Sequence, residues 1–387
     1  MCMKNVSKLL YFDHAAISPV RPEVLQELER VSQEAWGNPS SLHGVGRTAK
    51  AVLDNSREVL THTLFGARPG QVIFTSGGTE GNNLVLRGVV EAKGVKGVHI
   101  ISQPTEHTSV LEVLRALEQE GAEVTWLPVD EFGLVNVDDL KRAVRPNTAL
   151  ISIMSANNEI GTVQPIKTLA EAAKADAPTA VFHTDACQTA GWLNLKDLGP
   201  LDAITITGTK FGGPRAGAVW VRRGLRLEPL QLGGGQESGL RSGTEAVPEI
   251  AGLAKAVELA GQERENRTRQ LIIWRDQLIR AFLELPQSRL NGHATQRLPQ
   301  NVHLSFAGVS GETLLVALDQ AGLAASTGSA CAAGSIGESH VFKAIGLPKR
   351  YIRGSLRLTL GWSTTEQEVK AGLKLIPKVI KDLRTKP

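Results

Sequence analysis

Short apolar runs alternate with amphipathic stretches over the first two thirds of the chain. Each run has the length of a buried strand, and the stretches between them repeat apolar residues at helical spacing. We expect strands at 71–76, 98–102, 123–129, 149–154, 180–186, 203–207 and 218–222. This alternation predicts an α/β fold in which helices cover both faces of a mostly parallel, seven-stranded sheet.

The intervening helices are well marked. In the stretch 109–121, Val110, Leu114 and Leu117 lie on one face, and Gly121 is placed to end the helix. A second amphipathic helix is expected at 166–175.

The pattern changes after about residue 262. A long charged helix is predicted at 263–285, and the alternation of residues 301–308 predicts a half-buried strand. Thr365 and Glu368 have the spacing of a capping box at the start of a final helix. We therefore expect a large α/β domain at 16–261 and a smaller α+β domain made of 1–15 and 262–387.

Composition narrows the class of protein. The 387 residues are 42% hydrophobic and 21% charged, which is typical of a soluble globular protein. No apolar run approaches the ~18 residues of a membrane span, and the N-terminus lacks the features of a signal peptide. The odd cysteine count (Cys2, Cys187 and Cys331) favours a reducing compartment, and we expect the cytoplasm. The net charge of +4 is spread along the chain, so direct nucleic-acid binding is not expected.

Polar side chains follow two consecutive predicted strands. Asp185 and Gln188 end one of them, and Lys210 follows the next. Because ligands of open α/β sheets bind beyond the carboxyl ends of the strands, a carboxylate and an amine could face one pocket. A buried ion pair between Asp185 and Lys210 explains the same pattern equally well.

The run SGGTEGNN at 76–83 lies between a predicted strand and a helix that begins near Thr79. Its Gly-Gly-Thr turn would present backbone N–H groups to an anion. The run fits neither the Walker A nor the GxGxxG pattern, so it favours a single phosphate and speaks against a Rossmann dehydrogenase. His107 follows another strand. A phosphate cradle, an aspartate and a lysine at strand ends are what pyridoxal phosphate requires.

Cys331 lies in the run AASTGSACAAGSIG. Its Ala, Gly, Ser and Thr neighbours restrain the backbone little, so we expect a mobile loop between Ala324 and Ser339 that carries the thiol to a substrate and then to an acceptor. The alternative is a small buried cysteine in an Ala-rich turn.

Ten stretches carry a resemblance that runs nearly from end to end. They are YFDHAAISPV, GNPSSLH, FTSGGTEGNN, EHTSV, NNEIGTVQPI, HTDACQ, TGTKFGGP, RSGTEAVP, STGSAC and SLRLTLG. With this order and spacing the chain resembles the class V aminotransferases of the fold type I pyridoxal-phosphate enzymes, and among them the NifS/IscS-like cysteine desulfurases.

The resemblance implies roles for the residues around the cofactor. Lys210 would form the Schiff base, Asp185 would pair with the ring nitrogen, and Gln188 would contact the phenolic oxygen. His107 would stack on the ring and transfer protons. Asn158 would lie near the phenolic oxygen and the substrate carboxylate.

The remaining implied roles concern phosphate, substrate and sulfur. Gly78, Thr79, Thr207 and Thr209 align with the phosphate site. Thr244 aligns with a phosphate contact from the neighbouring subunit, which implies a homodimer. Arg357, favoured over Arg353, would bind the substrate carboxylate. Cys331 would be the nucleophile that becomes a persulfide.

Two positions depart from the family pattern. Thr209 stands where a histidine is usual, which puts the affinity for the phosphate and the electronic state of the cofactor in doubt. Cys187 stands where Thr or Ala is usual, and we expect it to be buried and inert. No metal site is expected, because the histidines show no metal-ligand spacing.

The implied reaction converts L-cysteine to L-alanine and leaves sulfur on Cys331 for an acceptor protein, such as an iron–sulfur scaffold or a thiolation factor. Two alternatives stay open. One is another class V enzyme, such as a selenocysteine lyase or a transaminase, in which Cys331 is a bystander. The other is a non-catalytic scaffold of a sulfur-transfer complex.

Overall fold

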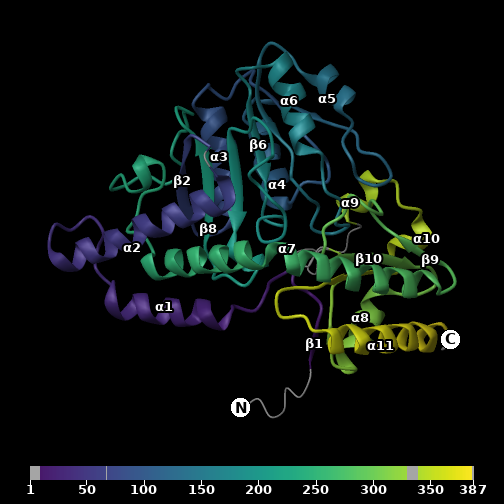
Figure 1. The fold of residues 1–387 in the computed structure, drawn as a ribbon. Helices are drawn as coiled ribbons and strands as arrows, with labels where there is room; N and C mark the ends of the chain where they lie inside the picture. The colour runs from purple at the N-terminus through teal and green to yellow at the C-terminus, as the bar shows by residue number, and fades with distance from the viewer. Residues whose placement is uncertain (1–8, 67, 329–338, 386–387) are drawn as a thin grey trace.

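The computed structural model describes residues 9–66, 68–328 and 339–385. The larger part of the molecule is built around a seven-stranded sheet (Figure 1). Its strands lie in the order β2-β8-β7-β6-β5-β3-β4. Their bounds are β2 Gly70–Thr75, β3 His99–Ser102, β4 Glu123–Trp126, β5 Thr148–Ser152, β6 Val181–Asp185, β7 Ala203–Thr207 and β8 Gly217–Arg222. Of the seven strands, β8 alone runs opposite to the other six, so the prediction of a mostly parallel, seven-stranded sheet is confirmed.

Helices cover both faces of this sheet. Consecutive residues of each strand point to opposite faces, so they pack against different helices. On β5, Leu150 packs with the apolar residues of α3 and α4, whereas Ile151 packs with those of α5 and α6. These helices are α3 Gly78–Glu91, α4 Thr108–Gln119, α5 Val137–Ala143 and α6 Ile166–Asp176. Burial on both faces explains why the strands read as unbroken apolar runs.

One long helix, α7 Val247–Leu283, crosses the middle of the molecule (Figure 1). It begins sixteen residues before the predicted start, because its first half also carries a buried apolar stripe. Helices α1 Pro22–Glu34 and α2 Gly44–Leu60 pack against α7. Residues 261 and 262, the expected domain boundary, lie inside this unbroken helix, and the division into domains stays a prediction.

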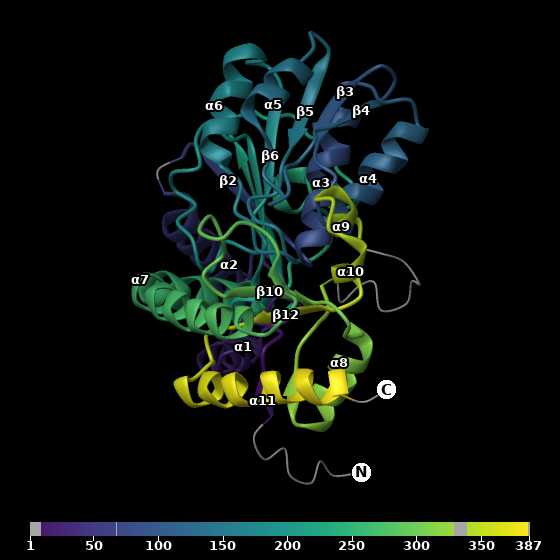
Figure 2. The ribbon, with the colours of Figure 1, turned by 90° about the vertical axis from the view of Figure 1, so that its right-hand side faces the viewer.

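The C-terminal part contains a second, antiparallel sheet in the order β12-β10-β9, with β9 Ser288–Leu290, β10 Asn301–Phe306 and β12 Ser355–Thr359 (Figure 2). Strand β1 Leu10–Tyr11 pairs with β11 Leu323–Ala324. The helices here are α8 Gly311–Gln320, α9 His340–Ala344, α10 Lys349–Ile352 and α11 Glu366–Thr385. Three short helical turns complete the described elements: η1 Thr61–Phe65, η2 Gly208–Lys210 and η3 Glu237–Gly239.

The prediction that the strand at 301–308 is half-buried is wrong, since every residue of β10 is buried. The polar positions find partners inside the protein. Asn291 Nδ2 donates to His303 Nδ1 at 2.9 Å and to Ser305 Oγ at 2.7 Å. Strand β10 is also the central strand of its sheet, so both of its edges are paired.

The capping box before α11 is confirmed. The backbone N–H of Thr365 donates to Glu368 Oε2 at 2.7 Å, and the N–H of Glu368 donates to Thr365 Oγ1 at 3.3 Å. Across residues 9–66, 68–328 and 339–385, no helix is both long enough and apolar enough to cross a membrane.

Candidate active site

A cavity of about 440 Å³ opens at the carboxyl ends of β2, β6 and β7. Its size lies in the range of small-molecule and cofactor sites, ~300–1,000 Å³. The predicted site residues that line it are Gly78, Thr79, His107, Asn158, Asp185, Gln188, Thr207, Thr209, Lys210 and Arg357. Thr244 is exposed and does not line the cavity, and Cys331 lies outside the described residues.

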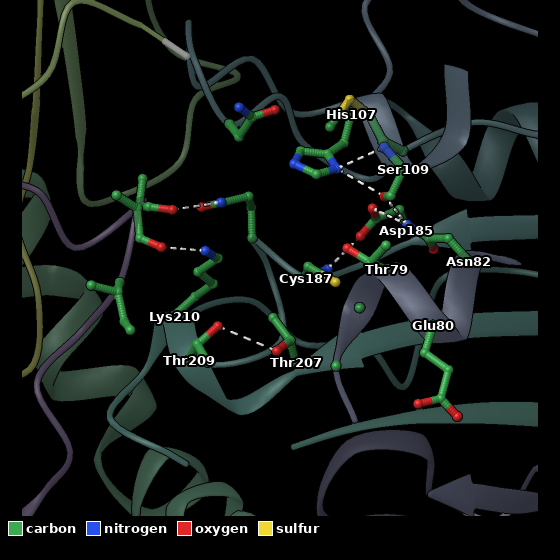
Figure 3. Close-up of a pocket in the computed structure, with 18 of the residues that line it drawn as sticks. Thr79, Glu80, Asn82, His107, Ser109, Asp185, Cys187, Thr207, Thr209 and Lys210 are labelled. Carbon is green, nitrogen blue, oxygen red and sulfur yellow. Dashed lines mark hydrogen bonds between the residues drawn. The ribbon is translucent and has the colours of Figure 1, made fainter. Parts of the chain in front are cut away.

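Strands β6 and β7 pair in parallel and place Asp185 and Lys210 at the same edge of the sheet (Figure 3). Asp185 is buried, and each of its carboxylate oxygens accepts a hydrogen bond. Oδ1 accepts from the Cys187 N–H at 2.9 Å, and Oδ2 accepts from Asn82 Nδ2 at 2.8 Å. The Lys210 amine donates to the carbonyl of Ala16. The carboxylate is therefore held rigidly, while the amine reaches into the cavity.

The first turn of α3 borders the cavity at the carboxyl end of β2. Gly77 is the N-cap, and the N–H groups of this turn have no partner inside the helix, so they favour an anion. A Cβ atom on Gly78 would lie 2.5 Å from Cys187 Sγ, so a larger residue at this position would require the Cys187 side chain to shift. The hydroxyls of Thr207 and Thr209 lie 3.3 Å apart on the same cavity.

His107 is the N-cap residue of α4. Its Nδ1 accepts from the Ser109 N–H at 3.1 Å and lies 2.8 Å from Ser109 Oγ. Ser109 Oγ accepts from Asn82 Nδ2 at 2.9 Å, so its own proton points to the imidazole. The neutral ring therefore carries its proton on Nε2. Burial lowers the pKa of His107, which keeps the ring neutral.

Arg357 reaches the cavity from β12 of the other sheet and is only 2% exposed. One of its terminal nitrogens donates to the carbonyl of Asn158 at 3.0 Å, and the other donates to Asp13 Oδ1 at 2.9 Å. Its Nε finds no hydrogen-bond partner within the described part of the chain. A buried guanidinium held in this way suits a carboxylate ligand. Arg357 lines the cavity and Arg353 does not.

Several cavity residues were missed from the sequence. Asn82 and Ser109 fall within quoted motifs, but their side-chain contacts join segments far apart in the chain. Arg215 also lines the cavity. Cys187, expected to be buried, is half-buried and lines the cavity. Desolvation and the nearby Asp185 raise the pKa of Cys187 well above its ordinary value, which favours the protonated thiol.

Comparison with known proteins shows the family to which the chain belongs. The sequence profile of the aminotransferase class-V family matches residues 10–371. Cysteine desulfurase IscS of Methanosarcina thermophila is 45% identical, and the match covers 98% of this chain and 95% of that protein.

Two solved structures are also similar. A NifS-like protein superposes with a TM-score of 0.90 at 34% identity, over 97% of this chain and all of that one. A structure titled SspA in complex with cysteine has a TM-score of 0.78 at 33% identity, over 90% of this chain and 98% of that one. The chain therefore belongs to the class-V aminotransferase family, and within it to the group that contains the NifS-like and IscS cysteine desulfurases.

Proposed function

We propose that this chain is a pyridoxal-phosphate-dependent cysteine desulfurase that takes sulfur from L-cysteine, releases L-alanine and holds the sulfur as a persulfide on Cys331. One observation carries the proposal. A lysine amine, a buried aspartate, a helix N-terminus and a buried arginine meet in one cavity at the carboxyl ends of the strands. The relatives named above support the activity, and the SspA structure with cysteine supports the substrate.

The residues present fit pyridoxal phosphate. Lys210 offers an amine for covalent attachment of the aldehyde. Asp185 offers a carboxylate, already fixed by two N–H donors, to the ring nitrogen. The first turn of α3 and the hydroxyls of Thr207 and Thr209 would hold the phosphate. When bound, this cofactor supplies an electron sink for the carbon atoms of the amino acid.

Arg357 and His107 would act on the substrate. Arg357 would bind its carboxylate, with Asn158 beside it on the cavity wall. His107 is held neutral with its proton on Nε2, so it can stack on an aromatic ring and pass a proton at that atom. Gln188, whose amide donates to the Ala15 carbonyl at 3.2 Å, would contact the phenolic oxygen of the cofactor.

The sulfur-transfer step belongs to Cys331. Its thiolate would attack the sulfur atom of the bound cysteine. A sulfur–sulfur bond forms as the carbon–sulfur bond breaks, and the electron pair of the broken bond stays on carbon. Protonation of that carbon completes alanine, and one sulfur atom remains on Cys331.

We also propose a cytoplasmic homodimer that passes the persulfide to an acceptor protein such as an iron–sulfur scaffold. Thr244 is exposed and does not line the cavity of its own subunit, so it is free to contact the phosphate in a second copy. Arg241, three residues earlier, pairs with Glu80 on the cavity wall at 2.8 Å. Large exposed side chains, with Trp36 at 71% and Leu232 at 81%, offer apolar surface for such a contact.

The proposal is tested with the cofactor-loaded protein and L-cysteine. We expect alanine to form and the peptide that contains Cys331 to gain the mass of one sulfur atom. Cys331→Ala should abolish alanine formation, whereas Cys187→Ala, the matched control, should still yield the Cys331 persulfide. Undiminished alanine formation by Cys331→Ala would show that another class V reaction operates.

A further inference from the structure

Two chain positions eleven residues apart meet at one carboxylate oxygen. Ser339 Oγ donates to Glu159 Oε2 at 2.7 Å. A Cβ atom on Gly328 would lie 2.9 Å from the same oxygen, so the backbone of Gly328 packs directly against it. Gly328 also has a φ of +142°, which an L side chain rarely adopts. Gly328 and Ser339 are the described residues on either side of the segment 329–338, which contains Cys331.

Glu159 is itself held firmly. Its side chain is buried, its N–H donates to Asn157 Oδ1 at 2.9 Å, and its carbonyl accepts from Asn301 Nδ2 at 3.0 Å. Burial raises the pKa of Glu159, and the hydrogen bond from Ser339 and the charges of His340 and Arg357 oppose that rise. A buried carboxyl group needs such partners, so the contact with Ser339 stabilises both residues.

The same region borders the substrate end of the cavity. Asn158, which precedes Glu159, lines the cavity and accepts from Arg357 at 3.0 Å. His340, which follows Ser339, is hydrogen-bonded through Nε2 to the carbonyl of Glu106 at 2.9 Å. Glu106 precedes His107 in the chain. Glu159 therefore connects both flanks of the segment to the residues that would hold the substrate.

The contact between Gly328 and Glu159 limits how far the Cys331 thiol can travel. An extended chain spans at most ~3.6 Å per residue, so Cys331, three residues beyond Gly328, stays within about 11 Å of it. A fixed Gly328 therefore limits the distance over which the chain can carry the thiol and raises its effective concentration within that distance. If Gly328 moved away, the reach of the thiol would move with it.

We propose that Glu159 is a positioning residue, whose carboxyl group fixes both flanks of the segment 329–338 at the substrate end of the cavity so that Cys331 reaches the substrate sulfur. The inference rests on the proposed desulfurase function. It assigns Glu159 to the sulfur-transfer step alone, and not to the binding of cofactor or cysteine.

The test separates these steps in a single turnover of the cofactor-loaded protein. Substrate binding is followed by the change in cofactor absorbance when L-cysteine is added, and sulfur transfer is followed by the rate at which the Cys331 persulfide appears. Glu159→Ala and Ser339→Ala each remove the shared hydrogen bond. We expect persulfide formation to slow about tenfold to a hundredfold, the effect of losing a hydrogen bond at a buried carboxyl group, while the absorbance change keeps its wild-type cysteine dependence.

Two further variants sharpen the result. Glu159→Gln keeps an acceptor oxygen for Ser339 and should restore most of the rate. Glu131→Gln, the matched control, changes an exposed glutamate paired with Arg289 and should have no effect. Glu159→Ala could impair folding, and Ser339→Ala also removes the N-cap of α9, where Ser339 Oγ accepts from the Val341 N–H at 3.1 Å. The decisive observation is therefore that both variants, which share only the loss of the Glu159–Ser339 bond, slow persulfide formation alike.

Wild-type persulfide rates in both Glu159→Ala and Ser339→Ala would overturn the inference. So would an equal loss of the absorbance change, since Glu159 would then act on substrate binding. Failure of the wild-type protein to form any Cys331 persulfide would instead contradict the proposed function, and the inference would fall with it.

Discussion

Asn82 Nδ2 donates a hydrogen bond of 2.8 Å to Asp185 Oδ2, across 103 positions of the chain. The same amide nitrogen donates to Ser109 Oγ, which in turn bonds His107. One buried side chain of α3 thus orients both the carboxylate expected at the cofactor ring nitrogen and the imidazole expected on the ring face. The orientation of both groups therefore depends on the hydrogen bonds of Asn82.

Asn82→Ala should therefore impair both groups. Asp185 loses one donor and Ser109 loses another, which should lower the free energy of unfolding by about 1–3 kcal/mol and weaken cofactor binding. Denaturant unfolding and a cofactor titration measure the two effects. Asn83→Ala is the matched control, because the Asn83 amide bonds only the nearby Thr79 carbonyl at the surface. Equal effects of the two substitutions would contradict the role of Asn82 in orienting Asp185 and His107.

Thr209 stands where the family usually has histidine, and restoring that histidine should strengthen cofactor binding. Thr209 can offer one hydroxyl, which lies 3.3 Å from Thr207 Oγ1. Thr209→His would add an imidazole N–H beside the expected phosphate, so we expect tighter cofactor binding. Titration with pyridoxal phosphate and with pyridoxal, which lacks the phosphate, isolates the effect. A gain with both compounds, or with neither, would show that residue 209 does not contact the phosphate.

Arg357→Gln should weaken cysteine binding by about tenfold to a hundredfold, the effect of losing charge-assisted hydrogen bonds to a carboxylate. Cofactor binding should change little. The cysteine dependence of the cofactor absorbance measures this affinity. Arg353→Gln removes the same charge four residues away, outside the cavity lining, and should bind cysteine normally. If Arg353→Gln instead showed the loss, the assignment of the substrate arginine would be wrong.

His303 makes stability depend on pH. Burial lowers its pKa from 6.5 to about 3, so the folded protein keeps the ring neutral where the unfolded chain protonates it. Between these values the unfolded state binds more protons, and the free energy of unfolding falls as the pH is lowered, by up to about 1.4 kcal/mol per pH unit.

His303→Gln should therefore flatten the dependence of the unfolding free energy on pH between 6.5 and 3. Urea unfolding at several pH values measures the slope, so a general loss of stability does not obscure the result. His62→Gln, at an exposed position, serves as the control and should leave the slope unchanged. An unchanged slope in His303→Gln would mean that His303 is protonated in the folded protein.

Much of the site could be predicted because its signals are local. Asp185 ends a strand, Lys210 and His107 each follow one, and parallel neighbours bring strand ends to one edge of a sheet. Long-range contacts could not be predicted. Asn82 acts on Asp185, and Glu159 acts on Ser339, through pairings that no sequence spacing marks.

Two predictions were wrong because the sequence pattern does not show how deeply a segment is buried. The polar side chains of β10 alternate as they do on a half-exposed strand, yet they are buried, and Asn291 bonds His303 Nδ1 and Ser305 Oγ inside the protein. The first half of α7 was missed because its small apolar residues pack against two other helices, and alanine spacing gives a weak pattern. Both errors arise where tertiary packing overrides local pattern.

The central claim is that Lys210 holds the cofactor covalently in the cavity shared with Asp185 and Arg357. Borohydride reduction of the loaded protein, followed by peptide mapping, tests it most directly. We predict that the reduced cofactor remains on the peptide that contains Lys210, and that Lys210→Ala retains none. A label on any other lysine, or no label in the wild-type protein, would contradict the account.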